Sequence, residues 1–278
     1  MLRNLVKSLP CNFDLLKLAD YNSGVKLSIV IPALNEAHRI EQTLEKVHSF
    51  CTRELSQWEI VVVDDGSVDG TQEKVERVGH ARCLRNSRNS GKGYSVRRGI
   101  LESSIDPVLF TDADLSAPIE EALPLLGAIE AGADVAIGSR AQATGKRVHR
   151  TPHRRLMAAA FRLLVKLIVI RGFHDTQCGL KMFRRDAGQA IFSRQRLDRW
   201  GFDVEVLYLA RKLGFRIDEV SINWSESTES RLRLTTPLSM ALDLVKIRWY
   251  SLTGAYRLGR SVETPPSRGP REDLEGKG

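Results

Sequence analysis

Short runs of β-branched residues alternate with amphipathic stretches along most of the chain. The runs have the length and composition of buried strands, and the stretches between them carry apolar residues at helical spacing. This alternation is typical of βαβ units arranged around a parallel sheet. The expected strands are residues 26–32, 59–64, 81–85, 107–111 and 134–138. The expected helices are residues 36–50, 71–78, 92–103 and 119–131.

The same pattern divides the chain into three parts. We expect an N-terminal extension over residues 1–25, a single α/β domain over residues 26–256, and a disordered tail over residues 257–278, which is rich in proline, glycine and charge. The predicted fold is a Rossmann-like, mostly parallel sheet flanked by helices, followed by C-terminal amphipathic helices.

Two of these late helices carry basic residues beside long apolar surfaces. In residues 154–171, Arg155, Arg162 and Lys166 fall on one stripe of an otherwise apolar helix, and residues 237–256 form a second candidate. Such helices suit the surface of an anionic bilayer, although packing on the domain core is the alternative. No stretch reaches the roughly 18–20 apolar residues of a transmembrane helix, and no signal peptide is recognisable. We therefore expect a cytoplasmic protein, peripheral at the cytoplasmic face of a membrane.

Composition narrows the possible functions. The 278 residues are 42% hydrophobic and 27% charged, which is typical of a globular protein. The four cysteines form no CxxC pair, so a zinc ribbon and a disulfide scaffold are both disfavoured. The net charge of +8 leaves three classes of partner open: nucleic acid, an anionic membrane surface, or a phosphorylated substrate.

Polar, acidic clusters follow three of the predicted strands. They are PALNE (32–36), DDGSVDG (64–70) and DADLS (112–116). Each cluster alone is also typical of a turn that caps a helix. Because ligands of such sheets bind beyond the carboxyl ends of the strands, three clusters at one edge favour a binding site.

The individual side chains suggest the chemistry of that site. Asp112 and Asp114 are two residues apart in extended chain, so both carboxylates can face one Mg²⁺ or Mn²⁺ ion. Carboxylates at Asp64 and Asp65 can accept hydrogen bonds from a base or a ribose, and Asn35 and Glu36 can play a similar part. In the loop NSGKG (89–93), backbone N–H groups and Lys92 are placed to face an anion, unless this is an ordinary glycine-rich loop.

The motifs together resemble a known family. SIVIPALNE, VVVDDGSVDGT, NSGKG, FTDADLS and GSR, in this order, are similar to family 2 glycosyltransferases of the GT-A fold. The later stretches DTQCGLKMFRR, RWGFDVEVLYLARKLGF and INWSESTESRL resemble the dolichyl-phosphate glucosyltransferases, with the mannosyltransferases as near relatives. The resemblance covers roughly residues 26–250. It implies a nucleotide-sugar donor, a divalent cation and a polyprenyl-phosphate acceptor.

The resemblance also implies roles for particular residues. Those matching the donor and metal site are Pro32, Leu34, Glu36, Val63, Asp64, Asp65, Asp112, Ala113 and Asp114. Those matching the acceptor-phosphate site are Arg140 and either Arg154 or Arg155. Two positions depart from the family pattern. Arg231 stands where relatives usually carry a lysine facing the donor phosphates, and Ser116 stands where some have a glutamine, which leaves the third metal ligand open.

The reaction implied is inverting transfer of glucose from UDP-glucose to a polyprenyl phosphate. GDP-mannose as donor, or a soluble phosphorylated acceptor, are alternatives within the family. A nucleotidyltransferase would normally carry a glycine-rich signature after the first strand, which PALNE lacks. A nucleic-acid-binding protein would have aromatic residues among its basic ones, whereas only 6% of the chain is aromatic; we expect no nucleic-acid partner.

Overall fold

The computed structural model describes residues 24–140, 161, 163–225 and 236–257 of the chain. The predicted N-terminal extension and tail lie almost entirely outside these ranges. Arg154, Arg155 and Arg231 also lie outside them, so the structure does not test the roles predicted for these three arginines.

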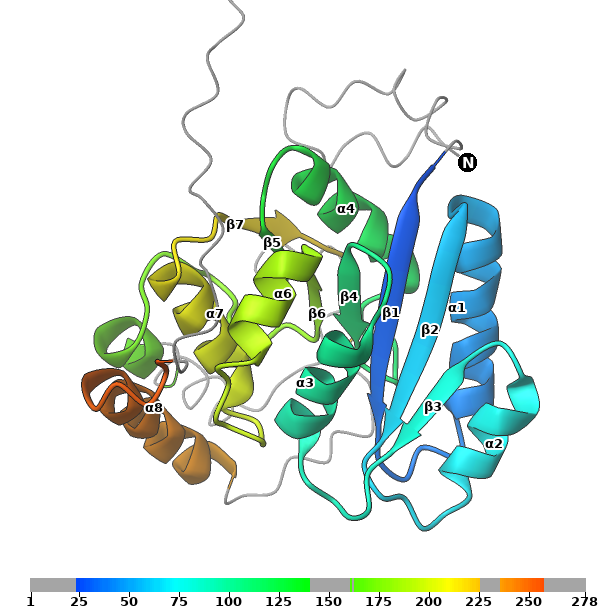
Figure 1. The fold of residues 1–278 in the computed structure, drawn as a ribbon, viewed down its shortest axis with the longest axis horizontal. Helices are drawn as coiled ribbons and strands as arrows, with labels where there is room; N and C mark the ends of the chain where they lie inside the picture. The colour runs from blue at the N-terminus through cyan, green and yellow to red at the C-terminus, as the bar shows by residue number, and fades with distance from the viewer. Residues whose placement is uncertain (1–23, 141–160, 162, 226–235, 258–278) are drawn as a thin grey trace, which may run out of the picture.

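A seven-stranded sheet lies at the centre of the described chain, in the order β3-β2-β1-β4-β6-β5-β7 (Figure 1). Strand β6 runs antiparallel to both of its neighbours, and the other pairs are parallel. The mostly parallel sheet is as predicted. The strands are β1 (Lys26–Ala33), β2 (Gln57–Asp64), β3 (Arg82–Arg85), β4 (Val108–Thr111), β5 (Val135–Ser139), β6 (Leu180–Phe183) and β7 (Ile217–Ser221).

Helices cover both faces of this sheet. One face packs against α1 (Ile40–Glu54), α2 (Thr71–Val78) and α4 (Ala122–Glu130), the last preceded by the short turn η3 (Ile119–Glu121). The other face packs against α3 (Lys92–Glu102), α6 (Arg185–Phe192), α7 (Phe202–Lys212) and α8 (Thr236–Leu252).

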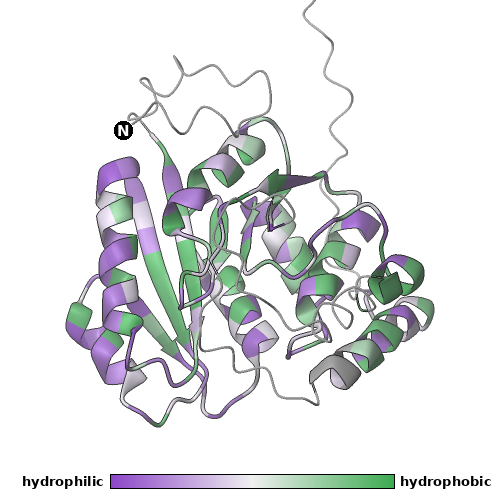
Figure 2. Cartoon of the chain, turned by 180° about the vertical axis from the view of Figure 1, so that it is seen from behind, coloured by the Kyte–Doolittle hydropathy of each residue, from purple (hydrophilic) through white to green (hydrophobic). Residues whose placement is uncertain are grey.

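Two apolar clusters, one on each face, form the core. Because successive side chains of a strand point to opposite faces, β1 sends Ile29 and Ile31 into one cluster and Val30 into the other. The hydropathy colouring shows the same arrangement, with apolar strands between helices whose outer sides are polar (Figure 2).

The five predicted strands and four predicted helices are present, with ends shifted by a few residues. The helix predicted from Glu36 begins instead at Ile40, because the preceding residues form a loop of the site. Strands β6 and β7 were not predicted. The LKMF sequence of β6 carries a lysine in its middle, and the IDEVS sequence of β7 is a polar, partly exposed edge strand.

One edge of the sheet collects the predicted clusters. Strands β1, β2 and β4 end there, and because β6 is reversed, its first residue Leu180 pairs with Thr111 at the end of β4. Strand β4 lies beside β1 although β2 and β3 come between them in sequence, so the chain order switches at this point. Such switch points are where ligands of α/β sheets bind.

Candidate active site

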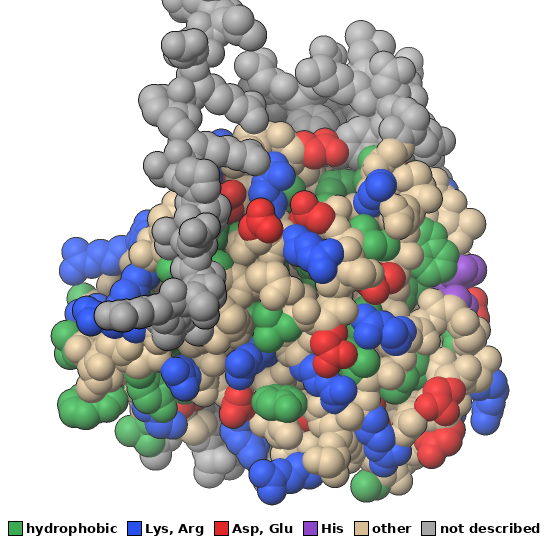
Figure 3. Space-filling view, in the orientation of Figure 1, with side chains coloured by type: hydrophobic (Ala, Val, Ile, Leu, Met, Phe, Trp, Pro, Cys, Tyr) green, Lys and Arg blue, Asp and Glu red, His purple; other side chains and the backbone are tan. Residues whose placement is uncertain are grey.

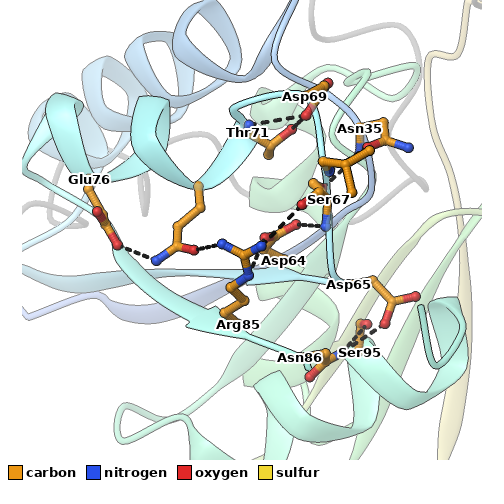
Figure 4. Close-up of polar contacts among 12 residues, drawn as sticks. Asn35, Asp64, Asp65, Ser67, Asp69, Thr71, Glu76, Arg85, Asn86 and Ser95 are labelled. Carbon is orange, nitrogen blue, oxygen red and sulfur yellow. Dashed lines mark hydrogen bonds and ion pairs between the residues drawn. The ribbon is translucent and has the colours of Figure 1, made fainter. Parts of the chain in front are cut away.

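The loops after β1 and β2 interlock through their backbone and side chains (Figure 4). Asn35 has a positive φ of 53°, and its backbone N–H donates to Ser67 Oγ at 2.8 Å. In return, Val68 N–H donates to Asn35 Oδ1 at 3.0 Å. Asn tolerates this left-handed backbone better than most residues. The PALNE and DDGSVDG motifs therefore form one unit.

Asp64 is fully buried at the end of β2. Its Oδ1 accepts a hydrogen bond from Ser67 N–H at 3.0 Å. Its Oδ2 accepts none from the described part of the chain, although Arg85 Nε lies 3.8 Å away. A buried carboxylate oxygen without a hydrogen-bond donor is costly, so this oxygen is a place where a ligand N–H or O–H would be stabilised.

Asp65 holds the next loop in place. Its Oδ1 accepts hydrogen bonds from Asn86 Nδ2 at 2.8 Å and Ser90 N–H at 2.9 Å, and its Oδ2 accepts one from Gly91 N–H at 2.8 Å. Two backbone N–H groups of the NSGKG loop thus face a carboxylate of the protein itself. Asp65 is only 3% exposed, so its side chain positions the loop that carries Lys92.

Lys92, at the start of α3, extends toward the DADLS turn. Its Nζ lies 2.6 Å from Asp112 Oδ1, and 5.5 Å and 5.3 Å from the ring centroids of Phe110 and Trp200. Burial alone would lower the pKa of Lys92, but the nearby carboxylates, Asp112 foremost, outweigh burial and raise this pKa. Lys92 is therefore a stable cation at the sheet edge that carries Asp64, Asp65, Asp112 and Asp114, called here the acidic edge.

A glycine makes room for Asp112. A Cβ atom at Gly179 would lie 2.7 Å from Asp112 Cγ and closer still to Oδ2. Gly179 immediately precedes β6, so the reversed strand passes directly against the carboxylate. The glycine of the DTQCG motif thereby sets the position of Asp112.

The rest of the DADLS motif is a tight turn. Asp114 Oδ1 accepts a hydrogen bond from Ser116 N–H at 3.0 Å, and Leu115 has a positive φ of 45°. Thr43 of α1 donates from Oγ1 to the carbonyl of Ala113 at 2.7 Å. Ser225 N–H donates to the carbonyl of Ser116 at 2.8 Å. The turn is held from both sides.

A buried ion pair lies beside Phe110, near the end of β4 just before this turn. Lys181 Nζ, fully buried on β6, lies 2.5 Å from Asp203 Oδ1 at the start of α7, and donates to the Cys178 carbonyl at 2.6 Å. The same Nζ lies 5.4 Å from the centroid of Phe110. Two ammonium groups, those of Lys92 and Lys181, therefore share one aromatic ring, which attracts cations electrostatically.

Arg140 lies past the end of β5 and pairs with Asp175. Its Nε and Nη2 donate to the two carboxylate oxygens of Asp175 at 2.5 Å and 2.8 Å. Burial would raise the pKa of Asp175, but the bonds to Arg140 outweigh it and lower this pKa. The guanidinium carbon lies 5.4 Å from the ring centroid of Trp224. Arg140 is thus fixed by one edge of its guanidinium.

The predicted donor residues differ in how their side chains are placed. Pro32, near the end of β1, and Leu34, in the loop after it, are partly exposed. Val63 is fully buried and Ala113 is 5% exposed, both within the apolar clusters. Any contact that these two residues make with a donor would therefore come from the backbone.

Several residues at this edge were given no role from the sequence. They are Asn86, Asp175, Gly179, Lys181, Trp200, Asp203 and Trp224. Most lie in the DTQCG and RWGFD motifs, which the sequence analysis used only for the resemblance. The signal available was a charged residue inside an apolar run, as with Lys181 in the sequence LKMF.

The residues present fit a divalent cation. Asp112, whose side chain is 35% exposed, and Asp114 both offer carboxylate oxygens, the ligands that Mg²⁺ and Mn²⁺ prefer. The ammonium of Lys92 already lies against Asp112, so positive charge is stabilised there. The Ser116 backbone is engaged in the turn.

Comparison with known proteins agrees with this geometry. A family model described as glycosyl transferase family 2 matches residues 28–192. The chain belongs to this family. It is therefore a glycosyltransferase, and the resemblance stated above is confirmed.

Among curated proteins, the chain is similar to dolichyl-phosphate beta-glucosyltransferases. It is 34% identical to one from Trichomonas vaginalis, across 88% of this chain and 77% of the relative. It is 34% identical to that of Homo sapiens, across 84% and 78%, and 37% identical to that of Saccharomyces cerevisiae, across 83% and 76%.

Among solved structures, the chain resembles glucosyl-3-phosphoglycerate synthase from Mycobacterium tuberculosis. The complex with Mn²⁺, UDP and glucosyl-3-phosphoglycerate matches with a TM-score of 0.63 at 21% identity, over 88% of this chain and 86% of the synthase. The complex with Mn²⁺ and UDP-glucose matches with a TM-score of 0.61 at 20% identity, over 88% and 85%. This likeness confirms the GT-A fold. None of the helices in the described residues is long and apolar enough to span a membrane.

A buried glutamate positions the loop that packs on Lys92. Glu205 on α7 is fully buried and accepts hydrogen bonds from the N–H groups of Arg196 and Leu197 at 3.0 Å and 2.8 Å. The Leu197 carbonyl would lie 2.6 Å from a Cβ at Gly93, so only a glycine fits there. Burial raises the pKa of Glu205 to about 7, although these hydrogen bonds oppose the shift.

We expect a pH-dependent stability from this group. Glu205 stays protonated in the folded state up to about pH 7, whereas its ordinary pKa is 4.5. The stability that protonated Glu205 contributes to the fold is therefore fully present below pH 4.5 and is lost as the pH rises through 7. This loss lowers the free energy of unfolding by about 3 kcal/mol at most. Glu205→Gln should flatten this dependence in urea unfolding at pH 5, 6, 7 and 8. The control is Glu45→Gln, on the exposed side of α1; parallel curves for wild type and Glu205→Gln would contradict the prediction.

Gly179→Ala should weaken metal binding by displacing Asp112. We expect Mn²⁺ affinity, measured by calorimetry in the presence of UDP, to fall about 10-fold to 100-fold, the loss for one charged contact of about 1.4–3 kcal/mol. The control is Gly188→Ala on α6, where a Cβ would lie 3.1 Å from Ile100 Cγ2. This control variant adds a methyl group to a tightly packed core position away from Asp112, so it shows the effect of lowered stability alone on Mn²⁺ affinity. Unchanged Mn²⁺ affinity in Gly179→Ala would contradict the assignment.

Proposed function

We propose that this protein transfers glucose from UDP-glucose to a dolichyl or other polyprenyl phosphate. An oxygen of the acceptor phosphate attacks C1 of glucose, the bond from C1 to the diphosphate breaks, and UDP leaves. A single in-line displacement converts an α-linked donor into a β-linked lipid-phosphate sugar. The observation that carries the proposal is the 34–37% identity to dolichyl-phosphate beta-glucosyltransferases over more than four fifths of the chain.

A carboxylate oxygen without a hydrogen-bond donor, in the proposed donor site, supports this proposal. The buried Oδ2 of Asp64, without a hydrogen-bond donor in the described chain, suits an N–H of the uracil base or a ribose hydroxyl. Asp65 acts one step removed, because both of its oxygens hold residues of the loop that carries Lys92. Asn35 and Glu36 lie in the neighbouring loop and stay predicted donor contacts.

Asp112 and Asp114 would hold the divalent cation. When bound, Mg²⁺ or Mn²⁺ supplies positive charge for the diphosphate leaving group. Lys92 lies beside Asp112, and we infer that its ammonium would contact the donor diphosphate next to the cation that Asp112 and Asp114 would hold. Its raised pKa keeps it charged throughout the neutral range.

Arg140 is the proposed acceptor residue. Asp175 holds its Nε and Nη2 edge, which aims the rest of the guanidinium in one direction. A phosphomonoester is largely anionic near pH 7, so the attacking oxygen requires little deprotonation. The acceptor side therefore needs a fixed cation more than a general base. Arg154 and Arg155 stay predicted as further acceptor contacts.

We also propose that the protein contacts a membrane surface, at its cytoplasmic face, where a polyprenyl acceptor resides. Helix α8 exposes an apolar stripe made of Leu242, Val245, Trp249 and Leu252, which are 56%, 57%, 64% and 78% exposed. Their spacing of three, four and three residues places them on one side of the helix. Figure 3 shows hydrophobic and basic side chains together at the edge of the molecule where α8 lies.

The test is a transfer assay with the purified full chain. UDP-glucose and GDP-mannose are each supplied with polyprenyl phosphate in detergent or with 3-phosphoglycerate, with Mg²⁺ or Mn²⁺. The soluble acceptor is included because a structural neighbour is described with phosphoglyceric acid. We expect glucosylated lipid and UDP as products, and loss of turnover in Asp114→Asn. Transfer only to 3-phosphoglycerate, or only from GDP-mannose, would overturn the proposed substrates.

Arg140→Ala should separate acceptor from donor binding. We expect UDP affinity by calorimetry to stay within about twofold, and transfer to polyprenyl phosphate to fall about 10-fold to 100-fold. Arg140→Lys should restore only part, because an ammonium cannot reproduce a guanidinium fork. Urea unfolding of each variant, with Asp175→Asn alongside, controls for the broken buried pair. If UDP affinity collapses while the acceptor KM stays constant, Arg140 belongs to the donor site.

A further inference from the structure

A basic cavity lies between the helices that carry the exposed apolar surface. It has a volume of about 520 Å³ and is lined by residues 166–171, by α7 and by α8. Of the residues that the structure describes, ten line it, and the charged ones among them are all cationic: Lys166, Arg171, Arg211, Lys212 and Arg248. None of these residues belongs to the acidic edge of the sheet.

The basic side chains are ordered by neutral groups. Arg211 Nη1 donates to the carbonyl of Arg171 at 2.6 Å, and Lys212 Nζ donates to Ser251 Oγ at 2.7 Å. Among the described residues, no aspartate or glutamate lines the cavity. Cations that line one cavity repel one another, and a bound anion would relieve that repulsion.

The cavity and the apolar stripe share the same helices. Arg248 directly precedes Trp249 on α8, and Lys166 directly precedes Leu167, which is 63% exposed. Leu163, 57% exposed, lies one helical turn before Leu167. An interfacial helix buries its apolar side at the acyl boundary, and its basic residues then lie at the depth of the phosphates.

We propose that this cavity binds the phosphate of an anionic membrane phospholipid. The proposal rests on the membrane contact proposed above and specifies how it is made: the stripe enters the bilayer and the cavity takes one lipid headgroup. Arg and Lys donors suit phosphate oxygens through charge-assisted hydrogen bonds. A lipid, unlike a nucleic acid, would also remove the neighbouring apolar stripe from water.

Sedimentation with vesicles tests the proposal on the full chain. Vesicles are made of phosphatidylcholine alone or with 30 mol% phosphatidylglycerol. The cavity variant is Lys212→Gln with Arg248→Gln, which removes two positive charges and keeps polar side chains at both positions. The control variant is Lys26→Gln with Lys46→Gln, which removes the same charge from exposed positions that do not line the cavity. Trp249→Ser tests the stripe.

The expected results separate the contributions. The cavity variant should lose about 10-fold to 30-fold in partitioning to phosphatidylglycerol vesicles, the effect of two cations at an anionic surface. The control variant should lose threefold or less. Trp249→Ser should weaken binding to both vesicle types. Thermal unfolding of every variant, and the single variant Lys166→Gln, guard against a folding defect.

A monomeric lipid distinguishes a site from diffuse attraction. Dihexanoyl phosphatidylglycerol, titrated below its micelle concentration, should bind wild type and control with one saturable site and fail to bind the cavity variant. Inorganic phosphate is titrated in parallel, and tighter binding of phosphate than of the lipid would overturn the lipid assignment. Equal loss in cavity and control variants would overturn the site. Wild-type binding to neither vesicle would overturn the membrane contact, whereas the detergent assay judges the transfer reaction separately.

Discussion

The ring of Phe110 and the two ammonium groups beside it hold the acidic edge together. Lys92 pairs with Asp112 on one side, and Lys181 pairs with Asp203 on the other. These four charged residues come from α3, the loop after β4, β6 and α7, so the arrangement links four separate parts of the chain. Removing one partner of the buried Lys181–Asp203 pair typically costs about 3–5 kcal/mol, because the other charge stays buried. The position of Asp112 therefore depends on the fold around it.

Most of the fold could be predicted because β1, β2, β4 and β5 are apolar runs with turn residues after them. Strand β6 could not, because its buried lysine is neutralised by Asp203, which is 22 residues further along the chain. Strand β7 has no apolar alternation, since it is an edge strand. Long-range pairing, which no local pattern contains, decided both strands.

The site was predictable at the level of motifs and less so at the level of contacts. The sequence placed Asp64, Asp65, Asp112 and Asp114 at one edge, and the structure brings them there. It could not distinguish the two neighbouring carboxylates: within the described residues Asp64 keeps one oxygen without a hydrogen-bond donor, whereas Asp65 uses both oxygens to hold a loop. Likewise, the glycines of NSGKG and DTQCG look like flexible turn residues, but Gly93 and Gly179 are needed because backbone or side-chain atoms approach them closely.

Charge is distributed in a way that matches the proposed transfer of a sugar from a diphosphate to a phosphate. In that proposal, the donor diphosphate would need cations at the acidic edge, where Asp112 and Asp114 would hold a metal beside Lys92. The acceptor phosphate would need a separate cation, for which Asp175 fixes Arg140. Carboxylates pair with each of these side chains, so their positive charge is offset until a ligand arrives. The cavity between α7 and α8 is different, because no carboxylate in the described part of the chain lines it. The cations at the acidic edge are paired with carboxylates, whereas those in the cavity have no such partner among the described residues. This difference would favour contact of the cavity with an anionic surface first, and binding of the substrate phosphates afterwards.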